Sequence, residues 1–129
     1  MAGYAIGLDM TVRGTEDRSF RKSFDSFTVL GPWVVTADAL PDASSLDLEL
    51  SIGGQPRQRS NTRFLIFGIE KLIAYASAAY TLYPGDVIVT GTPEGVAPVA
   101  PGDRMDCRIE AVGAMSVMVH APGEGARNG

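Results

Sequence analysis

Three observations predict a mainly β domain with one substantial helix, an α+β architecture. Apolar and polar residues alternate in several short runs, which is the period of a half-buried strand. Fifteen Gly and eight Pro residues supply many turn signals between those runs. Apolar residues recur at helical spacing over residues 69–80, and continuous βα alternation is absent. A doubly wound parallel sheet is therefore not supported.

The first third of the chain predicts two extended segments joined by a long loop. The alternating apolar residues of the first segment are Tyr4, Ile6, Leu8, Met10 and Val12. Residues 13–26 follow neither the strand nor the helical period and predict a polar loop. Residues 28–36 return to an extended apolar pattern, broken at Gly31-Pro32. Loops as long as residues 13–26 are often functional.

The rest of the chain predicts a hairpin, the helix and a final strand pair. Leu46, Leu48, Leu50 and Ile52 alternate with polar residues, and Gly53-Gly54 fits a two-residue turn before a return strand over residues 55–60. The apolar face of the predicted helix consists of Ile69, Leu72, Ile73, Ala76 and Tyr80. After Pro84 we expect a short strand over residues 86–90, a glycine-bearing loop over 91–95, and antiparallel strands over 105–112 and 115–119.

Length and charge limit the functions that the chain could have. Its 129 residues fit one domain, which we place at residues 1–120, with a flexible tail at 121–129. The net charge of −4, without a basic run, argues against nucleic-acid binding, so a small molecule is the expected partner. The sequence lacks an apolar stretch of membrane-spanning length, and we expect no membrane association. The lone Cys107 predicts a packed thiol in a reducing cytoplasm.

A strand-to-loop passage gathers an acid and two bases. Asp9 offers an oxygen ligand to a hard cation, Arg13 a planar fork for an anionic group, and Lys22 a compact positive charge. On spacing alone, solvated charges around a surface loop are the stronger interpretation.

A second candidate is the segment Thr90 to Gly95, which follows the predicted strand directly. Gly91 and the Thr92 hydroxyl could approach an anionic ligand there, although a tight turn that needs glycine conformations explains the pattern as well. His120 is interpreted as a surface residue. Trp33 is assigned to the core, and Tyr75 and Tyr80 to helix packing.

Five blocks of sequence resemble consecutive blocks of the fumarylacetoacetate hydrolase family, in the family's order and spacing. The blocks are GYAIGLDMTVR (3–13), RKSFD (21–25), LGPWVVT (30–36), RQRSNT (57–62) and LYPGDVIVTGTPEGV (82–96). The resemblance extends from Gly3 to about Val119. It implies the catalytic domain of that family, with a mixed β-roll fold.

The resemblance also implies roles for particular residues. Asp9 matches a carboxylate ligand of a Mg²⁺ or Mn²⁺ ion, and Lys22 matches the active-site lysine. Thr92, with Gly91, matches a substrate-binding segment, and Arg13 matches an arginine that lines the same pocket. The implied chemistry is metal-dependent hydrolysis of C–C bonds in small 2-oxo or β-diketo acids. Isomerisation or decarboxylation of 2-hydroxy-dienedioates in aromatic catabolism is the alternative, and an inactive or oligomerisation remnant is the non-enzymatic one.

The chain also departs from the family pattern. Gly14 stands where many members have Asp, and Glu16 where Gln is common. Family members carry a Glu-x-Glu metal pair, and the hydrolases a His/Glu base, upstream of the first block, which here is preceded by Met1 and Ala2 alone. We therefore expect an N-terminally truncated fragment with an incomplete β-roll, taken from an enzyme that is a homodimer when intact.

Overall fold

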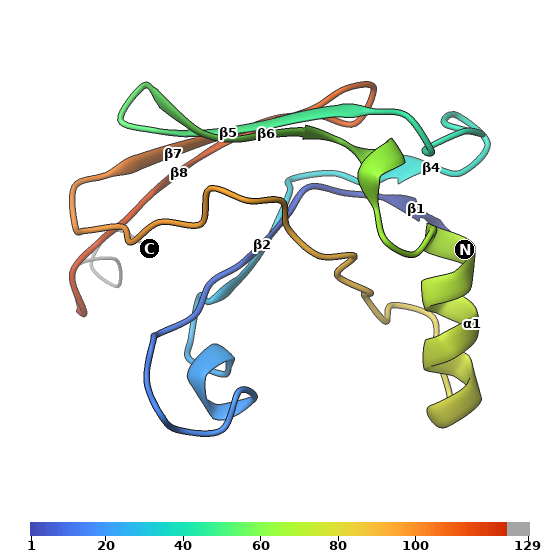
Figure 1. Ribbon diagram of the computed structural model, residues 1–129, viewed down its shortest axis with the longest axis horizontal. Coiled ribbons are helices and arrows are strands. Elements are labelled where there is room, and N and C mark those ends of the chain that lie inside the picture. The colour runs from blue at the N-terminus through green and yellow to red at the C-terminus, as the bar shows by residue number, and fades with distance from the viewer. Residues whose placement is uncertain (124–129) are drawn as a thin grey trace.

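The computed structural model describes residues 1–123 and confirms a mainly β chain with one α-helix among those residues. Figure 1 shows a twisted sheet above two short strand pairs, with the helix beside one end of the sheet. The strands are β1 Gly3–Tyr4, β2 Gly7–Asp9, β3 Thr28–Leu30, β4 Val35–Thr36, β5 Asp47–Ile52, β6 Gln55–Asn61, β7 Arg104–Ile109 and β8 Gly113–Met118. The helices are α1 Ile69–Ala79 and the 3₁₀ turns η1 Phe20–Lys22 and η2 Thr62–Phe64.

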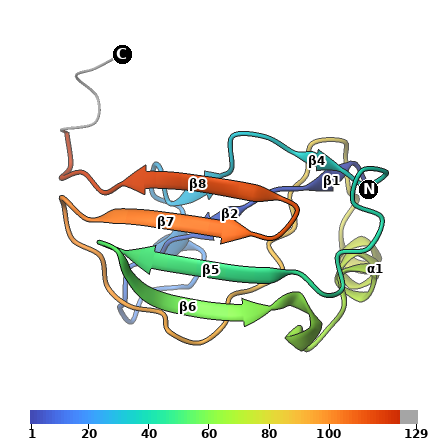
Figure 2. The same cartoon turned by 90° about the horizontal axis from the view of Figure 1, so that it is seen from above.

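A four-stranded antiparallel sheet has the order β6-β5-β7-β8 (Figure 2). The predicted β5–β6 hairpin is confirmed. Its turn needs Gly53 and Gly54, because both have positive φ angles, of 56° and 78°. The final pair is also confirmed, but β7 ends at Ile109 rather than at residue 112, since the chain already turns at Ala111 with φ of 57°.

One face of this sheet forms the core. Leu50, Cys107 and Met115 lie beside one another on adjacent strands. The buried core residues are Ile6, Leu40, Ala43, Leu46, Cys107 and Val112. Cys107 is 5% exposed and packs as predicted, and its burial raises the pKa of the thiol to about 11. The opposite face is polar, with Glu49 in register with Arg108.

The short pairs β1–β4 and β2–β3 form the second layer (Figure 1). The predicted strand over residues 4–12 is interrupted at Ala5 and Ile6 and ends at Asp9. The interruption lies opposite Gly31-Pro32, where Gly31 N donates to Ile6 O at 2.6 Å. Proline has no N–H to continue the ladder. Both expected extended segments therefore break at the same level.

Helix α1 begins and ends close to the predicted limits but packs less than expected. Ile69 contacts the hydrophobic core, whereas Tyr75 and Tyr80 are 81% and 73% exposed. The assignment of both tyrosines to helix packing is wrong, because α1 lies beside the end of the sheet and not across its face (Figure 1). Trp33 is likewise 51% exposed, although its indole N–H donates to Val112 O at 2.8 Å.

The predicted strand over residues 86–90 is wrong. This segment pairs with no strand among residues 1–123, and Val87 and Val89 remain 57% and 47% exposed. An alternating pattern becomes a strand only where a neighbouring strand supplies hydrogen-bond partners.

Two further predictions concern membrane association and the C-terminal tail. In the described part of the chain, no helix is both long and apolar enough to cross a membrane. Of the tail predicted at residues 121–129, residues 124–129 lie outside the described residues.

Candidate active site

The loop between β2 and β3 folds back on itself and brings its middle to the end of β2. Met10 N donates to Phe27 O at 2.9 Å, and Val12 N donates to Arg21 O at 3.2 Å. The first bond continues the antiparallel β2–β3 pairing by one residue, and the second leaves that register and joins the chain after β2 to η1. They place η1, which contains Lys22, beside Asp9 at the end of β2.

Local side-chain contacts hold this loop in place. The Phe20 and Phe24 rings meet edge to face with centroids 5.4 Å apart, and Phe27 adds a second contact at 5.2 Å. Asp17 accepts hydrogen bonds from the hydroxyl and the backbone N–H of Ser19, which lower the pKa of the Asp17 carboxyl. The loop predicted to be polar therefore has an aromatic cluster and a turn held by the Asp17 side chain.

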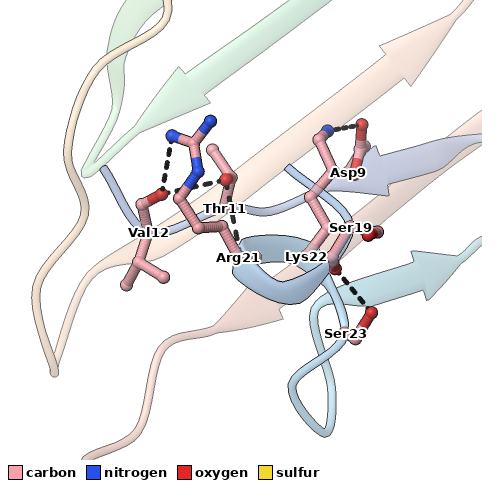
Figure 3. A network of polar contacts seen from close by, with 7 residues as sticks. All are labelled: Asp9, Thr11, Val12, Ser19, Arg21, Lys22 and Ser23. Carbon is pink, nitrogen blue, oxygen red and sulfur yellow. Dashed lines mark hydrogen bonds and ion pairs between the residues drawn. The ribbon is translucent and has the colours of Figure 1, made fainter. Parts of the chain in front are cut away.

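Lys22 Nζ forms an ion pair with Asp9 Oδ2 (Figure 3). The side chains are 41% and 37% exposed, so solvent reaches both charges. An exposed pair of this kind contributes at most about 1 kcal/mol to folding. The pair therefore contributes little to the stability of the fold. The contact involves one of the two carboxylate oxygens of Asp9.

The second candidate segment is anchored on β6. Gln58, which is 8% exposed, donates through Nε2 to Thr92 Oγ1 at 2.7 Å and to Pro93 O at 2.8 Å. Gly95 lies so close to β6 that an added Cβ would sit 1.9 Å from Arg57 O. The loop over residues 91–95 is thus fixed at both its Thr92 and Gly95 positions.

The contact between Gly95 and Arg57 O predicts how substitutions of the two loop glycines affect stability. Gly95→Ala combines a positive φ of 94° with the collision on Arg57 O, whereas Gly91→Ala has a positive φ of 108° and open space around its Cβ. We expect Gly91→Ala to lower the free energy of unfolding by about 1 kcal/mol from backbone strain. Gly95→Ala should lower it by roughly 1–3 kcal/mol more, as overpacking does. Urea denaturation of both variants checks this, and equal losses would contradict the docked position of Gly95.

The structure joins some of the predicted residues and not others. Asp9 and Lys22 are in contact, while Arg13 is exposed and makes no hydrogen bond or ion pair within residues 1–123. Thr92 is held by Gln58, and no hydrogen bond within the described chain connects it to the Asp9–Lys22 pair. His120 is exposed, as predicted.

Sequence reasoning overlooked Gln58. It belongs to the block RQRSNT that carries the resemblance, and no role was assigned to it. The available signal was a polar residue within a predicted hairpin strand. A buried amide of this kind needs hydrogen-bond partners.

The donor set is too small for a divalent cation. Among residues 1–123, no group of three His, Cys, Asp or Glu side chains is placed to hold a metal ion. Mg²⁺ is usually bound by more than one protein or substrate oxygen together with water. Asp9 fits as one ligand, but the described residues do not complete a site. A depression of about 460 Å³ lies on the polar face of the sheet, lined by residues such as Glu49 and Asp106, and includes none of the predicted site residues.

Residues 1–120 match the family described as fumarylacetoacetate (FAA) hydrolase, C-terminal. The maleylpyruvate hydrolase of Aquipseudomonas alcaligenes is 54% identical over 121 residues, which are 94% of this chain and 42% of that protein. A 4-hydroxyphenylacetate degradation bifunctional isomerase/decarboxylase of Salmonella dublin is 41% identical over 118 residues, 88% of this chain and 28% of that protein.

A solved structure gives the same correspondence. Maleylpyruvate hydrolase from Sphingobium sp. SYK-6, in complex with manganese(II) ion and pyruvate, superimposes with a TM-score of 0.87 at 52% identity. The match covers 92% of this chain and 44% of that one. The chain therefore spans less than half the length of these relatives, and their fold is reproduced over the matched part.

Proposed function

Because the chain belongs to the fumarylacetoacetate hydrolase family, we propose that it forms part of the active site of a divalent-metal-dependent hydrolase. Its substrates are small 2-oxo or β-diketo acids of the acylpyruvate type, cleaved at a C–C bond. The observation that carries the proposal is the Asp9–Lys22 pair, an acid and a base held together at the end of β2 by the folded-back loop. The maleylpyruvate hydrolase relatives support the choice of substrate class.

Each residue has a distinct part in this proposal. Asp9 contributes one oxygen ligand to Mg²⁺ or Mn²⁺, and the remaining ligands come from outside residues 1–123, since the described residues do not complete the site. Lys22 holds negative charge on the substrate as the C–C bond breaks, because its ammonium group lies at the same place. Arg13 pairs with the substrate carboxylate, and Thr92 and Gly91 hold a substrate oxygen.

The fold supports an incomplete mixed β-roll. The segment over residues 86–90 has a strand pattern but no paired strand within residues 1–123, and α1 leaves Tyr75 and Tyr80 exposed. A polypeptide that supplies a strand and an apolar surface would complete both features. In the intact enzyme, which we propose to be a homodimer, such surfaces are covered.

Isomerisation or decarboxylation of a 2-hydroxy-dienedioate is the second candidate function. The Salmonella dublin relative favours it, and positive charge beside a 2-oxo acid enolate assists either reaction. Product analysis separates the candidates, because hydrolysis yields two acids, decarboxylation yields CO₂, and isomerisation leaves the mass unchanged. A remnant without activity, the third alternative, would give none of these products.

A grafted enzyme tests the proposal. In it, residues 1–120 of this chain replace the matching segment of the 54% identical Aquipseudomonas alcaligenes enzyme. We expect Lys22→Met, which retains the aliphatic stem and removes the charge, to lower kcat by roughly ten- to thousand-fold, as the loss of one stabilising donor does. Acylpyruvate cleavage is followed by loss of enol absorbance.

Lys71→Met is the matched control for Lys22→Met. Lys71 lies on α1 with its ammonium 4.5 Å from the centroid of the Phe67 ring, away from Asp9. The same chemical change there should leave kcat within about two-fold, as expected for surface substitutions away from special features. Unchanged kinetics in Lys22→Met would instead assign Lys22 to the solvated surface.

A further inference from the structure

We propose that Gln58 is a positioning residue that fixes the Thr92 hydroxyl as a hydrogen-bond donor toward a substrate oxygen. The inference rests on the proposed function, in which Thr92 contacts the substrate. Gln58 does not touch the substrate itself. It acts through the loop over residues 91–95, which it joins to the sheet.

The orientation of the Gln58 amide follows from its partners. Pro93 O is a carbonyl oxygen and only accepts hydrogen bonds, so the Gln58 atom at 2.8 Å from it must be the NH₂ nitrogen. The second N–H of the same nitrogen then points to Thr92 Oγ1 at 2.7 Å. The Pro93 carbonyl therefore determines which Gln58 atom faces the loop, and with it the direction of the hydrogen bond between Gln58 and Thr92.

The direction of the Gln58–Thr92 hydrogen bond decides whether the Thr92 hydroxyl can donate its own proton to a ligand. A hydroxyl has one proton to donate and two lone pairs to accept. Because Thr92 Oγ1 accepts from Gln58, its own proton is directed elsewhere and is available to an oxygen of a bound ligand. Thr92 is exposed and faces solvent in the described structure. A carboxylate or a developing enolate oxygen is the kind of acceptor that such a donor favours.

A β-bulge turns Gln58 toward this loop. The register of β5 and β6 shifts between Leu50 and Ser51, so that Ser51 lies opposite Pro56 while Leu50 lies opposite Gln58. The extra residue, Arg57, reverses the alternation of β6 and places Gln58 on the core-facing side with Leu50. Bulges often re-aim a side chain next to an active site. Arg57 O also lies against Gly95, so the bulge contacts both ends of the loop.

The grafted enzyme measures the effect on catalysis. We expect Gln58→Met, of similar shape but without donors, to lower kcat/KM by about 10- to 100-fold. Gln58→Glu should lower it further, because a carboxylate accepts the Thr92 proton and faces the Pro93 carbonyl. Gln55→Met is the matched control, since Gln55 is an exposed glutamine on the same strand. We expect its kcat/KM to remain within about three-fold of the parent.

A double-mutant cycle separates positioning from a purely structural role. In a Thr92→Val background the effect of Gln58→Met should shrink to less than about three-fold, because both changes remove the same donor. Thr92→Ser keeps the hydroxyl and should restore the sensitivity to Gln58→Met. Multiplicative effects of Gln58→Met and Thr92→Val, or no effect of Gln58→Met, would overturn the proposal.

Limited proteolysis tests the placement independently of activity. In the full 129-residue chain, Gln58→Met should speed cleavage within residues 91–95 by at least about ten-fold relative to Gln55→Met, since the loop loses two anchoring bonds. Unchanged cleavage overturns the proposal even if the grafted enzyme is active. If the unsubstituted grafted enzyme folds but has no turnover, the proposed function fails, and proteolysis alone decides whether Gln58 positions the loop.

Discussion

The purified chain should not cleave acylpyruvates on its own, even with millimolar Mg²⁺, whereas the grafted enzyme should cleave them. Asp9 is the carboxylate available at the candidate site, and it is already paired with Lys22. No cluster of three metal-binding side chains exists among residues 1–123 to support it. A single exposed carboxylate binds Mg²⁺ too weakly to organise a substrate. The measurement is the loss of enol absorbance with purified chain, Mg²⁺ and an EDTA control.

Complementation provides the positive control for the isolated chain. The part of the Aquipseudomonas alcaligenes enzyme that the chain does not match, expressed separately and mixed with it, should restore some turnover, since the match covers 42% of that enzyme. EDTA should abolish the restored activity. Robust EDTA-sensitive turnover by the chain alone would contradict the donor set inferred from the structure.

Local patterns predicted the elements whose partners are close in sequence. The β5–β6 hairpin follows from two residues, Gly53 and Gly54, whose positive φ angles determine the turn and therefore the pairing. Helix α1 follows from 3.6-residue spacing within eleven residues. Neither prediction required knowledge of the rest of the fold.

Patterns that depend on distant neighbours were less informative. The segment over residues 86–90 has the composition of a strand, but it has no neighbouring strand in the described structure and remains unpaired. Tyr75 and Tyr80 were assigned to packing from their aromatic character, yet nothing within residues 1–123 buries them. Alternation and apolarity describe what a segment could bury, and tertiary contacts decide whether it does.

The candidate site likewise contains one contact that local sequence patterns predict and one that they do not. Asp9 and Lys22 were expected to share one strand-to-loop passage, and the folded-back loop does join them. Gln58 was missed because a bulge at Arg57 reverses the strand alternation, and nothing in a period-2 pattern announces such a shift. The contact between Arg13 and a substrate remains a prediction, since Arg13 is exposed and unpaired within the described residues.

Asp9→Ala should remove the activity of the grafted enzyme by weakening its metal binding, with little change in its stability. Loss of groups that only orient metal ligands lowers metal affinity by about 10- to 100-fold, and loss of a direct ligand should lower it at least as much. The free energy of unfolding should change by no more than about 1 kcal/mol, because the Asp9–Lys22 pair is exposed. Calorimetric titration with Mn²⁺ and urea denaturation measure the two quantities separately.

Two comparison variants make the Asp9 result specific. Asp25→Ala removes an exposed carboxylate from the same loop and should leave Mn²⁺ affinity unchanged. Lys22→Met should leave Mn²⁺ affinity the same or higher, because it removes the cation that pairs with Asp9, while still lowering kcat. Metal titration thus distinguishes a ligand, whose loss lowers Mn²⁺ affinity, from a charge-stabilising residue, whose loss does not. Unchanged Mn²⁺ affinity in Asp9→Ala would reassign Asp9 as a partner that only orients Lys22.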